Sequence, residues 1–219
     1  MRAAASILIL LAWAAAAQAA AVKAENGRVV LDGRPITSGH RDSDPVLSPD
    51  GRHVVFQRQI PGKLLVDCSA TGDGATPVEL WMADADGRAP RRLLELHSEK
   101  DVKTTVCAFD SVQFSPDGQI LYFETPAWAT SGAIHVYDFK TGRESFLMAG
   151  DSLLVLRTCH FAPYQGDLIV SQHRYFVFSG SYDWSFLFTP DGKEVGPLGD
   201  GDFSDDLDDK CEWQVRRNR

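Results

Sequence analysis

The four-residue run Ser-Pro-Asp-Gly occurs twice in this chain, each time between two apolar segments. Proline presets φ for the first central position of a turn, Asp bonds to the turn backbone, and Gly accepts the left-handed conformation that reverses the chain. The sequence therefore predicts turns from an inner strand to the next strand outward at Ser48-Pro49-Asp50-Gly51 and Ser115-Pro116-Asp117-Gly118. Because turn chemistry explains these residues, we do not expect catalysis by Asp50 or Asp117.

The segments around these turns are short and rich in Val, Ile, Phe, Tyr and Trp, and helical periodicity is nearly absent beyond the N-terminus. Such runs predict an all-β protein. A pattern of strand, turn, strand, loop, strand, turn and strand begins at Asp44, again at Asp110, and in weaker form near Thr158, where Ala162-Pro163-Tyr164-Gln165-Gly166 takes the place of the turn. Each unit predicts a four-stranded antiparallel meander, which is the blade of a β-propeller.

Two units resemble the WD40-like PD40 repeats of TolB-type propellers. The matching residues are SDPVLSPDGRHVVFQRQ with VELWMADADGRAPRRLLE, and DSVQFSPDGQILYFET with AIHVYDFKTGRESFLM. The resemblance covers residues 43–96 and 110–150, and weakly 157–199. It implies a TolB-like β-propeller fold, and such propellers serve as periplasmic interaction modules and as accessory domains of peptidases.

The chain departs from that family in length. TolB-like propellers have six or more blades, whereas this sequence shows three recognisable units, and an incomplete ring leaves open sheet edges. Three arrangements would deal with the edges. The tail CEWQVRR pairs with the N-terminal GRVVLDGRPITSG to form a fourth blade, two chains combine into an oligomer, or the blades pack as an open sandwich. At about 47 residues per blade, four blades match the mature length, so we favour the first arrangement.

The N-terminus predicts export. Arg2 precedes an apolar run from Ala3 to Ala17, and Ala17-Gln18-Ala19 forms a small-x-small cleavage site. Residues 1–20 are therefore interpreted as a secretory signal peptide, because the run is shorter than the roughly 20 residues that a membrane span needs. We expect residues 21–219 to form a single periplasmic or secreted propeller domain, without a stable membrane span.

Cys68, Cys107, Cys159 and Cys211 make an even number of cysteines, which in an exported protein favours two disulfides. Three pairings exist, and proximity in the sequence favours Cys68 with Cys107 and Cys159 with Cys211. No C-x-x-C spacing is present, so a zinc ribbon or a thioredoxin-like redox pair has little support.

The net charge of −8 becomes −9 when Arg2 is lost with the signal peptide. A nucleic-acid partner is disfavoured, because phosphate binding needs a basic surface. The stretch GDGDFSDDLDDKCEW at residues 199–213 gathers six Asp residues. Calcium favours such oxygen ligands, but the spacing is not that of an EF-hand loop, so we interpret the stretch as a solvated acidic loop and expect no cofactor, with calcium as the alternative.

Catalytic signals are weak. The chain contains no G-x-S-x-G nucleophile motif, and we expect no hydrolase domain after the propeller part. His160 and His173 are candidates for a metal or histidine site near the propeller axis, although their spacing fits no standard ligand pattern. His135 stands where the other units have Trp81 and Phe186, so packing explains it best.

Exposed aromatic residues are the strongest binding candidates. TPAWATSGA and SGSYDWS are expected in loops between the second and third strands of their blades, and they supply Trp128, Tyr182 and Trp184. Trp and Tyr often anchor a protein partner, although these rings could equally fold back over the blade edges. The sequence thus predicts an exported TolB-like binding module that mediates protein–protein interaction. The alternative is a periplasmic hydrolase or lyase with a metal or histidine site on the propeller axis.

Overall fold

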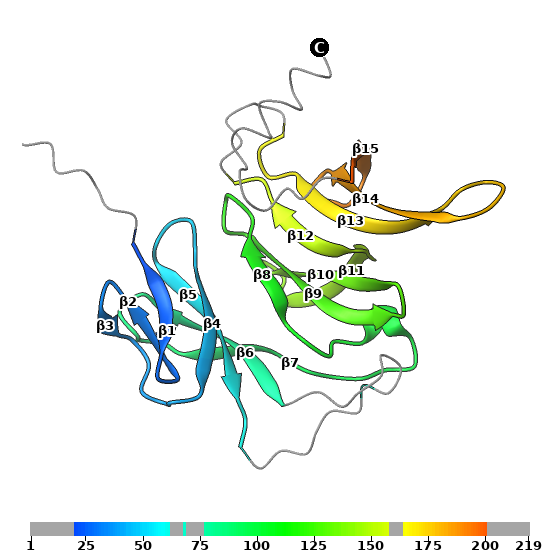
Figure 1. Ribbon diagram of the computed structural model, residues 1–219. Helices are drawn as coiled ribbons and strands as arrows, with labels where there is room; N and C mark the ends of the chain where they lie inside the picture. The colour runs from blue at the N-terminus through cyan, green and yellow to red at the C-terminus, as the bar shows by residue number, and fades with distance from the viewer. Residues whose placement is uncertain (1–19, 62–67, 69–76, 158–163, 201–219) are drawn as a thin grey trace, which may run out of the picture.

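The computed structural model describes residues 20–61, 68, 77–157 and 164–200 of the 219-residue chain. These residues form four antiparallel sheets that follow one another in chain order (Figure 1). A single 3-10 turn, η2 (Val102–Thr104), lies between the second and third sheets in this part of the chain. None of the described helical segments has the length and apolar character of a membrane span.

Each sheet is a meander of consecutive strands, so neighbours in the sheet are neighbours in the chain. The first sheet contains β1 (Val22–Glu25), β2 (Arg28–Leu31) and β3 (Arg34–Pro35). The second contains β4 (Asp42–Leu47), β5 (His53–Gln59), β6 (Val78–Asp84) and β7 (Arg91–Glu95). The third contains β8 (Asp110–Phe114), β9 (Ile120–Trp128), β10 (Ser131–Asp138) and β11 (Arg143–Ala149). The fourth contains β12 (Asp151–Val155), β13 (Leu168–Tyr175), β14 (Ser181–Phe188) and β15 (Glu194–Gly199).

The second, third and fourth sheets are the three blades expected from the repeat, and the all-β fold class is confirmed. The expected start of the third repeat near Thr158 is wrong, because its first strand β12 begins at Asp151. The missed signal is the dipeptide Asp151-Ser152, which matches Asp110-Ser111 at the start of β8. In both strands the Ser has a positive φ and the ladder shifts register just after it.

The N-terminal residues form a sheet of their own, in which β2 pairs with β1 on one side and with β3 on the other. This three-stranded sheet packs on β4 of the second sheet. The expected partner strand CEWQVRR lies outside the described residues, as do the signal peptide and Cys159 and Cys211. The structure therefore shows three complete blades and one three-stranded N-terminal sheet in its described part.

The core lies between the sheets, and alternation along each second strand explains it. In β5, Val54 and Phe56 face the first sheet while Val55 faces the third. In β9, Leu121 and Phe123 point back to the second sheet and Tyr122 points forward to the fourth. Because both faces of an inner blade are buried, these strands read as continuous apolar runs rather than as alternating ones.

The two Ser-Pro-Asp-Gly turns share one hydrogen-bond pattern. The hydroxyl of Ser115 donates to Oδ1 of Asp117 at 2.6 Å and accepts from the Ile120 amide at 3.0 Å. Ser48 makes the same two bonds to Asp50 and His53. The bond from Ser115 is the main cause that lowers the pKa of Asp117. These side chains are occupied in closing turns, consistent with a structural role.

A disulfide joins Cys68 to Cys107, with their Cα atoms 6.1 Å apart. This is the pairing that proximity in the sequence favours. It connects the long β5–β6 connection to the segment that precedes β8, so it links the second and third sheets. The loop that it closes has a sequence separation of 39 residues.

The disulfide should make a measurable contribution to stability. In the chain-entropy picture a loop of this size contributes about 4 kcal/mol, because the crosslink restricts the unfolded chain. We expect Cys68→Ser/Cys107→Ser to lower the free energy of unfolding by about 2–4 kcal/mol in urea titrations. An unchanged urea midpoint would show that the bond adds nothing to this fold.

A buried carboxyl should give stability a pH dependence. Burial raises the pKa of Asp167, just before β13, to about 6. A raised folded-state pKa favours folding below the unfolded value of about 3.9, and that advantage is lost as the pH rises through the folded value. Replacing Asp167 with Asn should therefore give a stability advantage over the native chain that widens from pH 4 to pH 7. Urea midpoints of the two proteins that stay parallel over this range would contradict the assignment.

Candidate functional site

A pocket of about 440 Å³ opens at the end of the third blade where β9 turns into β10. Its wall includes Trp128 and Gly132 from the β9–β10 connection and the carboxylates of Asp110, Glu124 and Asp151. Asp110 and Asp151 begin the innermost strands of two neighbouring blades. The pocket therefore sits where the third and fourth sheets meet.

Bulges in the first strands shape this rim. Ser111 and Ser152, each one residue after its Asp, have φ values of 48° and 55°, which are uncommon for residues other than Gly. The pairing of each strand shifts register at this point. A bulge of this kind bends a strand and redirects the side chains beside it. In both strands the bulge lies directly after the Asp residue, and both Asp110 and Asp151 line the pocket.

Glu124 links the two blades at the pocket. Its carboxylate accepts hydrogen bonds from the backbone amides of Leu153 at 2.6 Å and Ser152 at 3.2 Å, both in β12. Gln57 has a similar role one blade earlier, because its side-chain amide donates to the carbonyl of Phe109 at 2.7 Å. A polar residue at the fifth position of the second strand thus holds the start of the next blade in both cases.

Gly132 holds the carboxylate of Asp151. The Gly132 amide donates to Oδ1 of Asp151 at 2.7 Å. A Cβ atom at residue 132 would lie 2.7 Å from the same oxygen, so a larger residue would displace the carboxylate. Burial raises the pKa of Asp151, and this hydrogen bond opposes the rise. Burial also raises the pKa of Asp110, with a further contribution from the charge of Asp44.

Trp128 forms the aromatic side of the pocket and is 38% exposed. Its ring meets Phe146 of β11 edge-on, with ring centroids 6.2 Å apart. The ring is therefore supported on one side and open to solvent on the other. The combination of a fixed aromatic surface and carboxylates suits a ligand that carries a positive charge on an apolar stem.

Tyr182 and Trp184 lie on β14 of the fourth blade and are not part of this pocket. They pack on each other with ring centroids 4.9 Å apart, and Tyr182 also contacts Phe176 at 4.7 Å. Both belong to the hairpin between the second and third strands of their blade, as Trp128 does in the third blade. The expectation that these three aromatic residues lie in loops is wrong, because the strands extend further than expected: Trp128 ends β9, and Tyr182 and Trp184 lie within β14. They belong to corresponding hairpins of adjacent blades but form two separate groups.

The structure does not test whether His160 and His173 converge, because His160 lies outside the described residues. His135 is fully buried, stacks against Phe123 and contacts the carboxylate of Glu144, in agreement with the packing role expected for it. His173 lies on β13 and pairs with Asp183 at 2.8 Å. Of the six Asp residues in the stretch 199–213, only Asp200 is among the described residues. Within the described ranges no group of three or more His, Cys, Asp or Glu residues could hold a metal ion.

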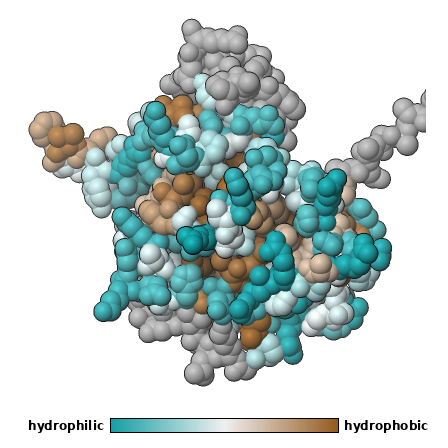
Figure 2. Space-filling model, turned by 180° about the vertical axis from the view of Figure 1, so that it is seen from behind, coloured by the Kyte–Doolittle hydropathy of each residue, from teal (hydrophilic) through white to brown (hydrophobic). Residues whose placement is uncertain are grey.

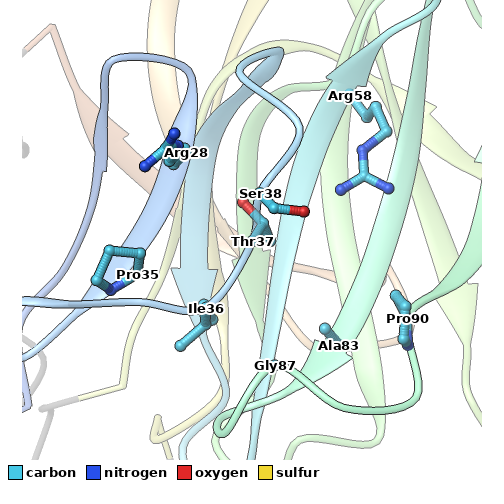
Figure 3. Close-up of a pocket in the computed structure, with 9 residues that line it drawn as sticks. All are labelled: Arg28, Pro35, Ile36, Thr37, Ser38, Arg58, Ala83, Gly87 and Pro90. Atoms are coloured by element: carbon cyan, nitrogen blue, oxygen red, sulfur yellow. The ribbon is translucent and has the colours of Figure 1, made fainter.

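A second pocket of about 460 Å³ lies between the N-terminal sheet and the second sheet (Figure 3). Arg28 lines one side, and the hydroxyl of Ser38 points toward the guanidinium of Arg58. Arg58 is already bound by Asp42, with Nε at 2.6 Å and Nη2 at 3.0 Å from its carboxylate oxygens. Arg28 contacts the ring of His40. The Arg58–Asp42 pair therefore joins β5 to β4 within the second sheet, and the contact of Arg28 with His40 links the N-terminal sheet to the connection that leads into β4.

Sequence reasoning missed both pockets. Asp110 and Glu124 are paired across β8 and β9 of one blade, and Asp151 joins them only when the next blade packs, so the three residues carry no recognisable spacing. The available signal was the repeated Asp-Ser dipeptide at the start of β8 and β12, which marks the positions that surround the rim. Arg28 and Arg58 are 30 residues apart, and nothing in the sequence links them.

The chain resembles solved propeller structures. The putative TolB of Agrobacterium tumefaciens superposes with a TM-score of 0.51 at 14% identity, over 83% of this chain and 58% of that one. The oligogalacturonate lyase of Vibrio parahaemolyticus gives a TM-score of 0.50 at 18% identity, over 82% and 44% of the two chains. TolB of Acinetobacter baumannii gives 0.47 at 18% identity, over 82% and 40%.

This chain thus spans between 40% and 58% of the length of these three proteins. No family model and no curated protein sequence matches it. Because the identities are low, the likenesses concern the fold and not the activity. The chain has a TolB-like β-propeller fold, as the resemblance of its repeats implied.

Proposed function

We propose that this chain is an exported binding module, periplasmic or secreted, that recognises a protein partner through the Trp128 pocket. The observation that carries the proposal is the pocket wall, which combines a half-exposed Trp with three carboxylates at the junction of two blades. Aromatic anchors in preformed pockets supply much of the binding energy of protein interfaces. The disulfide between Cys68 and Cys107 supports export, since such bonds persist in oxidising compartments.

The chemistry of the pocket suggests what the partner presents. Carboxylates bind Lys and Arg through charge-assisted hydrogen bonds, and the face of a Trp ring attracts the same cations. Asp110, Glu124 and Asp151 are acidic, and no Lys or Arg lines this pocket among the described residues. We therefore infer that a basic side chain of the partner enters the pocket. Trp184, on the next blade, would extend the contact surface, and Tyr182 would support its ring.

The proposal is tested by capture of a partner from periplasmic extract of the source organism. Trp128→Ala should weaken binding about 10- to 100-fold, because it removes the aromatic wall. Asp110→Asn should weaken binding to a basic partner and reduce its dependence on salt. Val195→Ser is the matched control, since Val195 is an exposed apolar residue on β15 away from the pocket.

A protein that the native chain and Val195→Ser retain, and that both pocket variants lose, supports the proposal. Equal capture by the native chain and all three variants would contradict the proposal that the pocket binds the partner. If only Trp128→Ala loses the partner, the result supports Trp128 as the aromatic anchor and contradicts the inference that a basic side chain of the partner enters the pocket. The alternative of a hydrolase or lyase on the propeller axis stays a prediction, and metal analysis with turnover assays on generic esters and peptides would test it.

A further inference from the structure

The hairpin of β13 and β14 extends beyond the sheet to which it belongs (Figure 1). β12 pairs with β13 only as far as Ser171, and β15 pairs with β14 only as far as Ser185. Beyond these residues the two strands pair with each other alone, from Gln172 opposite Trp184 to Tyr175 opposite Ser181. At about 3.3 Å per residue, this two-stranded ribbon reaches about 13 Å past the sheet before its loop begins.

The apex of this ribbon is apolar and exposed. Phe178 is 99% exposed and Val177 is 94% exposed, and Tyr175 and Phe176 are exposed as well. Figure 2 shows an apolar projection on the side of the molecule where the hairpin of Figure 1 points after the half-turn. A cluster of large apolar side chains on a protruding tip is unfavourable in water and marks a surface that meets another phase or molecule.

Charged side chains are absent from the apex itself. No residue from Tyr175 to Tyr182 carries a charged side chain. Behind the apex, Arg174 forms an ion pair with Glu194 at 2.7 Å, and the carboxylate of Asp183 contacts the ring of His173 at 2.8 Å. The apex itself therefore offers no cation to an anionic surface and no anion to a basic one.

Polarity changes in steps along the ribbon. The tip is formed by Phe176, Val177 and Phe178. The amphipathic ring of Tyr175 follows, and that of Tyr182 lies one residue pair closer to the sheet. Arg174, opposite Tyr182, forms its ion pair with Glu194, and His173 and Asp183 make the next residue pair toward the sheet. A lipid bilayer presents the same order from its hydrocarbon to water, with Tyr and Trp favoured at the interface.

We propose that the apex of the β13–β14 hairpin inserts into the interfacial region of a lipid bilayer and attaches the propeller reversibly to that surface. This contact is distinct from the Trp128 pocket, which remains free for a protein partner. The insertion is shallow, because the backbone groups of the loop need water or headgroups to satisfy their hydrogen bonds. Since the apex is uncharged, a zwitterionic bilayer is sufficient and salt has little effect.

The test is flotation of the purified chain, without residues 1–20, with phosphatidylcholine vesicles at 0.1 and 0.5 M NaCl. We expect the protein to float with the vesicles at both salt concentrations. The double variant Val177→Ser/Phe178→Ser should reduce the partition coefficient at least 10-fold, because it removes the two most exposed apolar side chains. Val195→Ser and Trp128→Ala should float like the native chain. Thermal unfolding of every variant establishes that it is folded.

Three results would overturn the proposal. The first is a native chain that stays in solution with the vesicles, and the second is a folded apex variant that floats as well as the native chain. The third is flotation with the phosphatidylcholine vesicles at 0.1 M NaCl that disappears at 0.5 M NaCl, because that would make the attachment electrostatic. If the native chain ignores vesicles but the apex variant loses a captured protein, the apex is a protein contact instead. Loss of partner capture by Trp128→Ala with intact flotation would leave the two surfaces independent.

Discussion

The structure depends on the packing of one apolar sheet face against the next. Val54, Val55 and Phe56 show the constraint in its simplest form, because successive side chains of one strand enter two different cores. A blade in such an array cannot be stable alone, since each of its faces is completed by a neighbour. The turns and the Cys68–Cys107 disulfide hold the array together, but the buried faces determine its order.

The same packing produces the candidate site. Glu124 can reach the amides of β12 only because Tyr122, two residues earlier in β9, is buried against the fourth sheet. The register shift after Asp151 brings the next carboxylate to the rim. The pocket is thus a consequence of joining two blades, and its acidic character comes partly from carboxylates, those of Glu124 and Asp151, that also accept backbone hydrogen bonds at the junction. The β13–β14 hairpin differs, because it extends past the region where neighbouring strands constrain it.

The fold is predictable because its signals are local. Ser48-Pro49-Asp50-Gly51 and the apolar runs around it carry turn and strand chemistry within a few residues. The start of the third blade is not predictable in this way. The connection between β12 and β13 lacks the Ser-Pro-Asp-Gly turn, and the dipeptide Asp151-Ser152 is a weaker signal. Trp128 stands out in the sequence because a Trp in an expected loop is unusual. Its carboxylate neighbours do not, since Asp110 and Asp151 become neighbours only through blade packing.

Amide hydrogen exchange tests the claim that neighbouring blades are one cooperative unit. The decisive amides are those of Val55, Leu121 and Val170, which lie in the second strands of three successive blades. Completion of each core by its neighbour predicts that all three exchange with the same free energy, equal to that of global unfolding in urea. Exchange at three distinct free energies, with one blade opening while its neighbour stays closed, would contradict the account.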